Sequence, residues 1–328
     1  MRGARLIGIG VILFGLAIFL TGVSHAQKKF PAKPINVIIP FQPGDTDNNL
    51  RPFTDKMAQY LGQPLNFVYK PGASGSIGAQ FVGKFSEPDG YTLVGTQQSS
   101  LVLVPLTTQG IAYTWNDFAP VCGLAGGYNV IAVQSKSRWK NIQELLAEAK
   151  QNPGKISYSS GSGALGITTL IAEAFFKEAG VKLNLIPAQG SGPAVMAILG
   201  GHTDAVSSQI TPAFPHIQAG TLRALVVSTE KRLPSMPDVP TCKELGYDVL
   251  VPSLYGLLAP KGTPKEVVEV IALAAKKAAE ENRAAIDASL SKSGMMINYR
   301  GPEQWAEFLK SQSEYWTKTV KALDLKKE

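Results

Sequence analysis

The stretch KPINVIIPFQPGDTDNNLR, from Lys33 to Arg51, places an apolar run directly before a turn-rich loop and a polar segment. The run Val37–Pro40 predicts a buried strand. The segment from about Asn48 to Leu61 predicts a helix. The loop between them, Pro43–Asp47, carries one glycine and two aspartates. This strand–loop–helix order is the unit from which layered α/β proteins are built.

The same alternation continues along the chain. Further strand-like runs are Leu65–Tyr69, Tyr91–Gly95, Val130–Val133 and Lys155–Ser159, and further helix-like segments are Ile77–Phe85, Ile142–Lys150, Pro264–Glu280, Ala284–Lys292 and Pro302–Leu325. Such alternation predicts α/β layers around mainly parallel strands. Because it is too long for one sheet with ordinary loops, we expect two α/β domains.

The first residues have the layout of a secretory signal peptide. Arg2 and Arg5 precede the apolar run Leu6–Leu20, and small residues before and at Ala26 fit a cleavage site. A transmembrane anchor is the alternative, but the apolar run is short for a span of about 20 residues. We therefore expect residues 1–26 to be removed by cleavage after Ala26 and the mature chain to be exported.

Charge and side-chain types argue against several classes of function. Loss of Arg2 and Arg5 removes two positive charges and lowers the formal charge from +7 to +5. No basic stripe with interleaved aromatics is visible, so we do not expect nucleic-acid binding. His202 and His216 lack a partner at metal-ligand spacing, so no metal or cofactor is expected. No serine lies in a nucleophile elbow, and we expect no enzyme.

The chain has two cysteines, Cys122 and Cys242. Export to an oxidising compartment favours a disulfide between them. Two separate buried thiols are the alternative, because sequence separation says nothing about whether the two Cα atoms approach closely. Both interpretations stay open at this point.

Four strand-to-helix junctions are rich in Gly, Ser and Thr. They are Pro43–Asp47, Lys70–Gly78, Ser159–Gly166 and Gln189–Ala194. In open α/β sheets, ligands bind beyond the carboxyl ends of strands, where free N–H groups and the positive ends of helices favour an anion. Each loop alone is explained by a tight turn with a helix cap. Four such loops in one chain favour a cleft that binds a carboxylate or a phosphate.

Longer segments resemble one family. The opening stretch Lys33–Arg51 resembles the start of the periplasmic solute-binding receptors of tripartite tricarboxylate transporters, also called Bug receptors. Four further segments resemble this family in the same order along the chain: Lys70–Val94, Pro187–Val206, Ile217–Tyr247 and Tyr255–Val268. The resemblance therefore covers nearly the whole mature chain.

The resemblance implies a two-lobed periplasmic-binding-protein fold of the Venus flytrap kind, with the ligand cleft between two α/β domains. Domain one would hold residues 27–125 and 230–328, and domain two residues 126–229. The implied function is capture of a small organic acid in the periplasm and its delivery to a transporter with two integral membrane subunits. We expect a monomer. The alternatives are a sensor that presents its ligand to a membrane signalling partner, and an exported enzyme that uses the same cleft.

The resemblance also implies ligand-binding positions, where family members hold a carboxylate by backbone N–H groups and waters instead of an arginine. These positions are Gly44, Thr46, Asp47, Gly72, Ala73, Ser74, Gly75, Ser76, Ile77, Gln97, Gln98, Ser99, Ser160, Gly161, Ser162, Gly163, Ala164, Gly190, Ser191, Gly192, Asp204, Ser207 and Ser208. Asp45 joins them as a candidate specificity residue.

Asp45 departs from the family pattern. The usual first loop reads PGG-x-TD, whereas PGDTD is one residue shorter and has Asp45 in place of the second glycine. A carboxylate at an anion site repels a ligand carboxylate. We therefore expect Asp45 to cap the following helix, to point away from the ligand, or to meet a ligand hydroxyl or ammonium group.

Overall fold

The computed structural model describes residues 30–161, 163, 165–188, 190–229, 231–233, 235–249 and 252–323. The predicted signal peptide and its cleavage site lie outside these residues. None of the helices in these ranges has the length and apolar character needed to cross a membrane.

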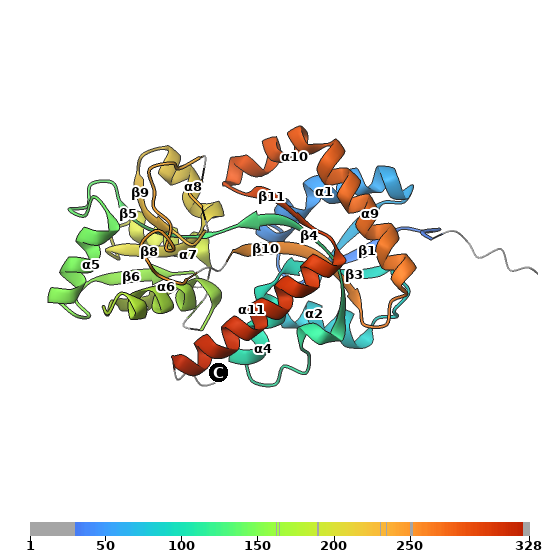
Figure 1. Ribbon diagram of the computed structural model, residues 1–328, viewed down its shortest axis with the longest axis horizontal. Helices are drawn as coiled ribbons and strands as arrows, with labels where there is room; N and C mark the ends of the chain where they lie inside the picture. The colour runs from blue at the N-terminus through green and yellow to red at the C-terminus, as the bar shows by residue number, and fades with distance from the viewer. Residues whose placement is uncertain are drawn as a thin grey trace, which may run out of the picture.

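Six strands form the first sheet, in the order β11-β4-β10-β3-β1-β2 (Figure 1). Their bounds are β1 Ile35–Ile39, β2 Leu65–Tyr69, β3 Thr92–Gln97, β4 Phe118–Gly127, β10 Ser253–Pro260 and β11 Met296–Arg300. Strand β1 pairs parallel with β2 and β3. Strand β10 runs antiparallel to β3 and β4, and β11 runs antiparallel to β4.

Five strands form the second sheet, in the order β7-β6-β8-β5-β9. Their bounds are β5 Asn129–Gln134, β6 Ser157–Ser160, β7 Asn184–Pro187, β8 Ala205–Gln209 and β9 Leu222–Val227. Strand β6 pairs parallel with β7 and β8, whereas β5 runs antiparallel to β8 and β9. Both sheets are therefore mixed, where the sequence predicted mainly parallel strands. The strands that arrive from the other lobe, β5 and β10, run against their neighbours.

Helices surround both sheets. Their bounds are α1 Asp45–Leu61, α2 Ser76–Phe85, α3 Ser99–Val102, α4 Val104–Thr107, α5 Ile142–Gln151, α6 Ile167–Glu178, α7 Ser191–Leu199, α8 Ile210–Gln218, α9 Lys265–Glu281, α10 Arg283–Leu290 and α11 Pro302–Ala322, with 3₁₀ turns at Ala73–Gly75, Trp115–Asp117 and Ser291–Ser293. Helix α1 buries Leu50, Phe53 and Met57 in the same core as β1. Apolar side chains at this spacing lie on one face of a helix, so this face of α1 packs against the first sheet.

Two chain crossings join the lobes. Strand β4 passes into β5 through Tyr128 alone. Ser253, the first residue of β10, pairs with Gly127 at the end of β4, so the outgoing and returning crossings lie close together. The described residues within 231–249 still lie beside the second sheet. There the Cys242 N–H donates to the carbonyl of Val227 in β9 at 3.0 Å.

The C-terminal helix α11 reaches from the first lobe to the second (Figure 1). Its start buries Trp305 and contacts β4. Near its end, the carbonyl of Ala322 accepts a hydrogen bond from Lys177 Nζ of α6 at 2.6 Å. This helix therefore adds a third connection between the lobes.

The prediction of a disulfide, which export favoured, is wrong. Cys122 and Cys242 are free and buried. Cys122 lies in β4 of the first sheet, whereas Cys242 bonds to β9 of the second sheet. Burial raises the pKa of each thiol to about 12. The alternative of two separate buried thiols describes the structure.

Candidate functional site

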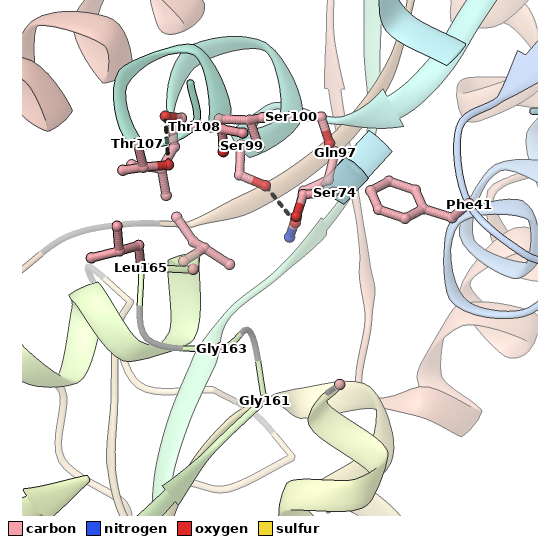
Figure 2. Close-up of a pocket in the computed structure, with 15 residues that line it drawn as sticks. Phe41, Ser74, Gln97, Ser99, Ser100, Thr107, Thr108, Gly161, Gly163 and Leu165 are labelled. Carbon is pink, nitrogen blue, oxygen red and sulfur yellow. Dashed lines mark hydrogen bonds between the residues drawn. The ribbon is translucent and has the colours of Figure 1, made fainter. Parts of the chain in front are cut away.

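A cavity of about 500 Å³ lies between the two lobes. From the first lobe it is lined by Phe41, Ser74, Gln97, Ser99, Ser100, Leu103, Val104, Thr107 and Thr108, and from the second by Gly161, Gly163, Leu165, Gly166, Ile167 and Gly190. Figure 2 shows Ser74, Gln97 and Ser99 on one side of this space and Gly161, Gly163 and Leu165 on the other. The lining segments follow the carboxyl ends of parallel strands, where α/β proteins bind ligands.

Three helices begin at this cavity. Gly75 is the N-cap of α2 and adjoins the lining residue Ser74, while Gly166 and Gly190 are the N-caps of α6 and α7 and line the cavity themselves. The first N–H groups of a helix have no partner inside the helix, and the helix dipole adds partial positive charge there. The cavity therefore favours an anion, because N–H donors from both lobes point to the same space.

No charged side chain lines the cavity among the residues that the structure describes. Gln97 supplies an amide instead. Its Oε1 accepts a hydrogen bond from Ser99 Oγ at 2.8 Å, which sets the orientation of the amide. Its Nε2 is buried and has no hydrogen-bond partner among the described residues. A buried donor without a partner costs about 1–3 kcal/mol, so Gln97 fits a ligand that brings an acceptor oxygen.

Two glycines allow the close contacts of the site. A Cβ at Gly161 would lie 2.3 Å from the Cα of Ser191, so the loop after β6 and the start of α7 touch backbone to backbone. Gly75 has φ +88°, and a Cβ there would lie 2.8 Å from Cζ of Phe41. Larger residues at either position would push the loops apart.

The N-terminus of α1 is capped by Asp47, not by Asp45. Gly44 is the N-cap residue, and its N–H donates to Asp47 Oδ1 at 2.6 Å. The second oxygen of Asp47 accepts from Tyr69 Oη at 2.9 Å. Asp47 is the third residue after the N-cap residue Gly44, so its side chain can reach back to the Gly44 N–H. The expectation that Asp45 caps this helix is therefore wrong.

Asp45 instead accepts hydrogen bonds from two other side chains. Tyr255 Oη in β10 donates to its carboxylate, as does Asn49 Nδ2 at 3.3 Å. Burial of the carboxyl group raises the pKa of Asp45, although these donors lower it in part. The residue as a whole stays exposed to solvent, which moderates the rise.

The predicted binding residues divide into three groups. Those that line the cavity are Ser74, Gln97, Ser99, Gly161, Gly163 and Gly190. Those that lie in the same loops or at the start of α1 without lining it are Gly44, Asp45, Thr46, Asp47, Gly72, Ala73, Gly75, Ser76, Ile77, Ser191 and Gly192. Ser162 and Ala164 lie outside the described residues.

The third group makes contacts within the fold. Gln98 donates through Nε2 to the carbonyl of Pro252 at 2.8 Å and accepts from the Leu254 N–H at 2.7 Å, so it anchors the start of β10. The hydroxyl of Ser160 forms a hydrogen bond with Thr168 Oγ1. The hydroxyl of Ser207 donates to the carbonyl of Thr168, and that of Ser208 donates to the carbonyl of Gln209. The structure does not bring these four side chains to the cavity.

Asp204 lies at the opposite end of the second sheet. Its Oδ2 accepts hydrogen bonds from the N–H and the hydroxyl of Ser157, the first residue of β6. The cavity lies beyond the last residue of β6, so the length of this strand separates Asp204 from the cavity. Asp204 precedes β8, and a residue before a parallel strand lies on the side away from the ligand edge.

Sequence reasoning missed the apolar part of the cavity. The missed lining residues are Phe41, Ser100, Leu103, Val104, Thr107, Thr108, Leu165, Gly166 and Ile167. Several of them are apolar side chains, which a sequence alone assigns to the core. A signal was present, because the segment Ser99–Thr108 directly follows β3 at the ligand edge of the first sheet.

Comparison with known proteins assigns the family. Residues 50–325 match the model of the tripartite tricarboxylate transporter family receptor. The chain belongs to this family. It is 35% identical over 306 residues to the UPF0065 protein in the gbd 5′ region of Cupriavidus necator, which covers 92% of this chain and 90% of the relative. It is 31% identical to the protein BugT of Bordetella pertussis over 98% of each chain. The resemblance stated from sequence is confirmed.

Solved structures with bound acids share the fold. MatC of Rhodopseudomonas palustris with bound malate has a TM-score of 0.75 at 26% identity, covering 89% of this chain and all of that one. An R. palustris protein with adipate has a TM-score of 0.79 at 25% identity, covering 91% of this chain and all of that one. The two-lobed periplasmic-binding-protein fold is thus confirmed. The two bound molecules, malate and adipate, are both small carboxylates.

Proposed function

We propose that this chain is a periplasmic receptor that captures a small organic acid between its lobes. It delivers the acid to a tripartite tricarboxylate-type transporter with two integral membrane subunits, and it acts as a monomer without catalytic activity. One observation carries this proposal: the N-termini of α2, α6 and α7 converge on a cavity whose described lining residues carry no charge. Such a site holds an anion by hydrogen bonds and helix ends.

The contacts support closure of the lobes on the ligand. Gln97 and Ser74 offer donors from one lobe, and the starts of α6 and α7 offer donors from the other. A ligand that contacts both lobes shifts the population toward the closed form. The single-residue crossing at Tyr128 supplies a short connection about which the lobes rotate.

The proposed lobes are residues 27–125 with 230–328, and residues 126–229, after cleavage of the signal peptide behind Ala26. We shift one boundary. Within residues 231–249, Cys242 bonds to the second sheet. The ring of Tyr247 packs edge to face against Phe175 of α6, with ring centroids 5.0 Å apart. We therefore propose that the chain returns to the first lobe between Val249 and Ser253.

A ligand screen tests the receptor function. The mature chain, residues 27–328, is purified and heated with a panel of small organic acids, and hits are measured by calorimetry. A ligand that binds only the native state raises the melting temperature by mass action. We expect a few related carboxylates to do so, and their amine and neutral analogues to have no effect. Hits confined to amines or neutral solutes contradict the proposal.

A deletion strain tests the role in transport. Loss of the chain should abolish uptake of the acid that the screen identifies. Intact uptake with loss of gene induction alone contradicts delivery to a transporter and favours a ligand-presenting sensor.

A further inference from the structure

We infer that a second cavity, at the crossings between the lobes, binds a hydrogenphosphate ion and thereby changes the affinity of the acid site. This inference goes beyond the proposed function, because it assigns a second ligand and a second site to the chain. It follows from the position of the cavity, the charge at its rim and a buried amide in its wall.

The second cavity has a volume of about 530 Å³. Its wall combines the end of β4, the crossing residue Tyr128, strand β11, helix α11 and the returning segment around Lys231. None of the described residues that line it also lines the acid cavity. In the first sheet, β10 and β4 separate β11 from β3, the strand that leads to the acid cavity. The second cavity is therefore a separate space.

The charged side chains that line this cavity are all basic within the part of the chain that the structure describes. They are Lys231 and Arg232, which are exposed at the rim, and Arg300 at the end of β11. Glu244 pairs with Arg232, with 2.8 Å between Nε and Oε2. Lys231 forms no ion pair with another described residue. The rim therefore keeps positive charge that attracts an anion.

A buried amide lines the same cavity. Gln312 of α11 is 7% exposed, and its Oε1 has no hydrogen-bond partner among the described residues. A buried acceptor without a partner is unfavourable, so this amide fits a ligand that brings an O–H group. Hydrogenphosphate combines an O–H group with negative oxygens that basic side chains bind. Sulfate has the same shape but carries no proton at neutral pH.

Both lobes build the cavity, so its shape depends on the angle between them. Lys231 follows β9 of the second sheet, Arg300 ends β11 of the first, and Tyr128 is the single residue between β4 and β5. An anion that contacts Lys231 and Arg300 together stabilises one angle over the others. Because closure on the acid depends on the same angle, phosphate and acid each change the affinity for the other by the same factor.

Calorimetry on the mature chain, residues 27–328, tests the site with inorganic phosphate at neutral pH and constant ionic strength. Sulfate is the matched oxyanion without a proton. We expect one phosphate to bind with a dissociation constant below about 1 mM, and sulfate to bind at least about fivefold more weakly. Absence of phosphate binding overturns the inference, and so does equal binding of sulfate.

Two variants locate the phosphate. Lys231→Ala should weaken phosphate binding at least about threefold and leave the acid affinity measured without phosphate unchanged. Gln312→Leu should abolish the preference for phosphate over sulfate. Lys155→Ala is the control, because Lys155 is exposed before β6 and lines neither cavity. Phosphate binding that survives Lys231→Ala and is lost when acid fills its own site places phosphate in the acid cavity and overturns the inference.

The coupling is measured with the best acid of the ligand screen, titrated with and without saturating phosphate. We expect its dissociation constant to change at least about threefold in the wild type and to stay constant in Lys231→Ala. An unchanged constant in the wild type overturns the coupling. Failure of every acid overturns the receptor function instead, and phosphate binding is then decided by the oxyanion titrations and the variants alone.

Discussion

The phenol of Tyr255 donates a hydrogen bond to the carboxylate of Asp45, although 210 positions of sequence separate the two residues. The bond joins the first turn of α1 to β10, the strand on which the chain returns from the second lobe. Asp45 therefore links the start of α1 to the strand on which the chain returns.

Loss of the Tyr255 hydroxyl should destabilise the protein. Tyr255→Phe leaves the Asp45 carboxylate without its donor from β10, and we expect the free energy of unfolding in urea to fall by about 1–3 kcal/mol. Tyr60→Phe is a matched control, because the Tyr60 hydroxyl bonds to Glu281 at the surface and its loss should matter less. Equal losses in the two variants contradict a special role for the Tyr255–Asp45 pair.

The raised pKa of Asp45 gives its contribution to stability a definite sign. Burial makes the folded state hold the proton on Asp45 more tightly than the unfolded state does. Its stabilising contribution is therefore complete below the ordinary pKa near 4 and is lost as pH rises through the raised folded pKa. Relative to Asp45→Asn, the wild type should gain stability as pH falls from 7.5 to 4. Urea unfolding across this range measures the difference, with Asp55→Asn on the exposed side of α1 as control. A constant or opposite trend contradicts the raised pKa.

Gln97→Glu should abolish most ligand binding. The substitution keeps the size of the side chain but replaces the donor Nε2 with a negative oxygen, which repels a carboxylate. We expect affinity for the best acid to fall by roughly ten- to a hundredfold, about 1.4–2.8 kcal/mol. Gln143→Glu, exposed on α5, adds the same charge away from the cavity and should leave affinity unchanged. Calorimetry distinguishes the two, and unaltered affinity in Gln97→Glu would remove this residue from the site.

Gly161→Ala should weaken binding through the shape of the second lobe. The new methyl group would overlap the backbone of Ser191, so the loop after β6 and the start of α7 must separate. We expect at least about a tenfold loss of affinity, since displaced donors no longer meet the ligand. Gly301→Ala is the control, because a Cβ there meets only Tyr299 Oη at 3.8 Å. Wild-type affinity in Gly161→Ala would show that the two loops move without consequence for the ligand.

The two thiols should be unreactive until the protein unfolds. Burial raises the pKa of both Cys122 and Cys242 to about 12, and the thiolate is the reactive form. A thiol reagent should therefore label neither cysteine in native protein at pH 8, and both in denaturant without reductant. Absence of labelling in denaturant would mean that the cysteines pair after all.

Sequence reasoning was most successful where local rules apply. The predicted strand Leu65–Tyr69 has the observed bounds, and the predicted helix Ile142–Lys150 differs from α5 by one residue. Asn141 caps α5 through its side chain, which is a local contact. Strands β4 and β11 were missed, because β4 draws its stability from pairing with β10 and β11, far away in sequence.

The amino-acid sequence by itself determined the α/β class, the glycine-rich loops at strand ends and the family, since these depend on local patterns and ordered motifs. The tertiary structure alone decided that Asp47 and not Asp45 caps α1, that Gln98 and Asp204 serve the fold, and that Leu103 and Leu165 face one cavity from different lobes. Those outcomes depend on which distant side chains meet when two lobes come together. Residue type cannot reveal such contacts, because the same leucine suits a core or a ligand wall equally well.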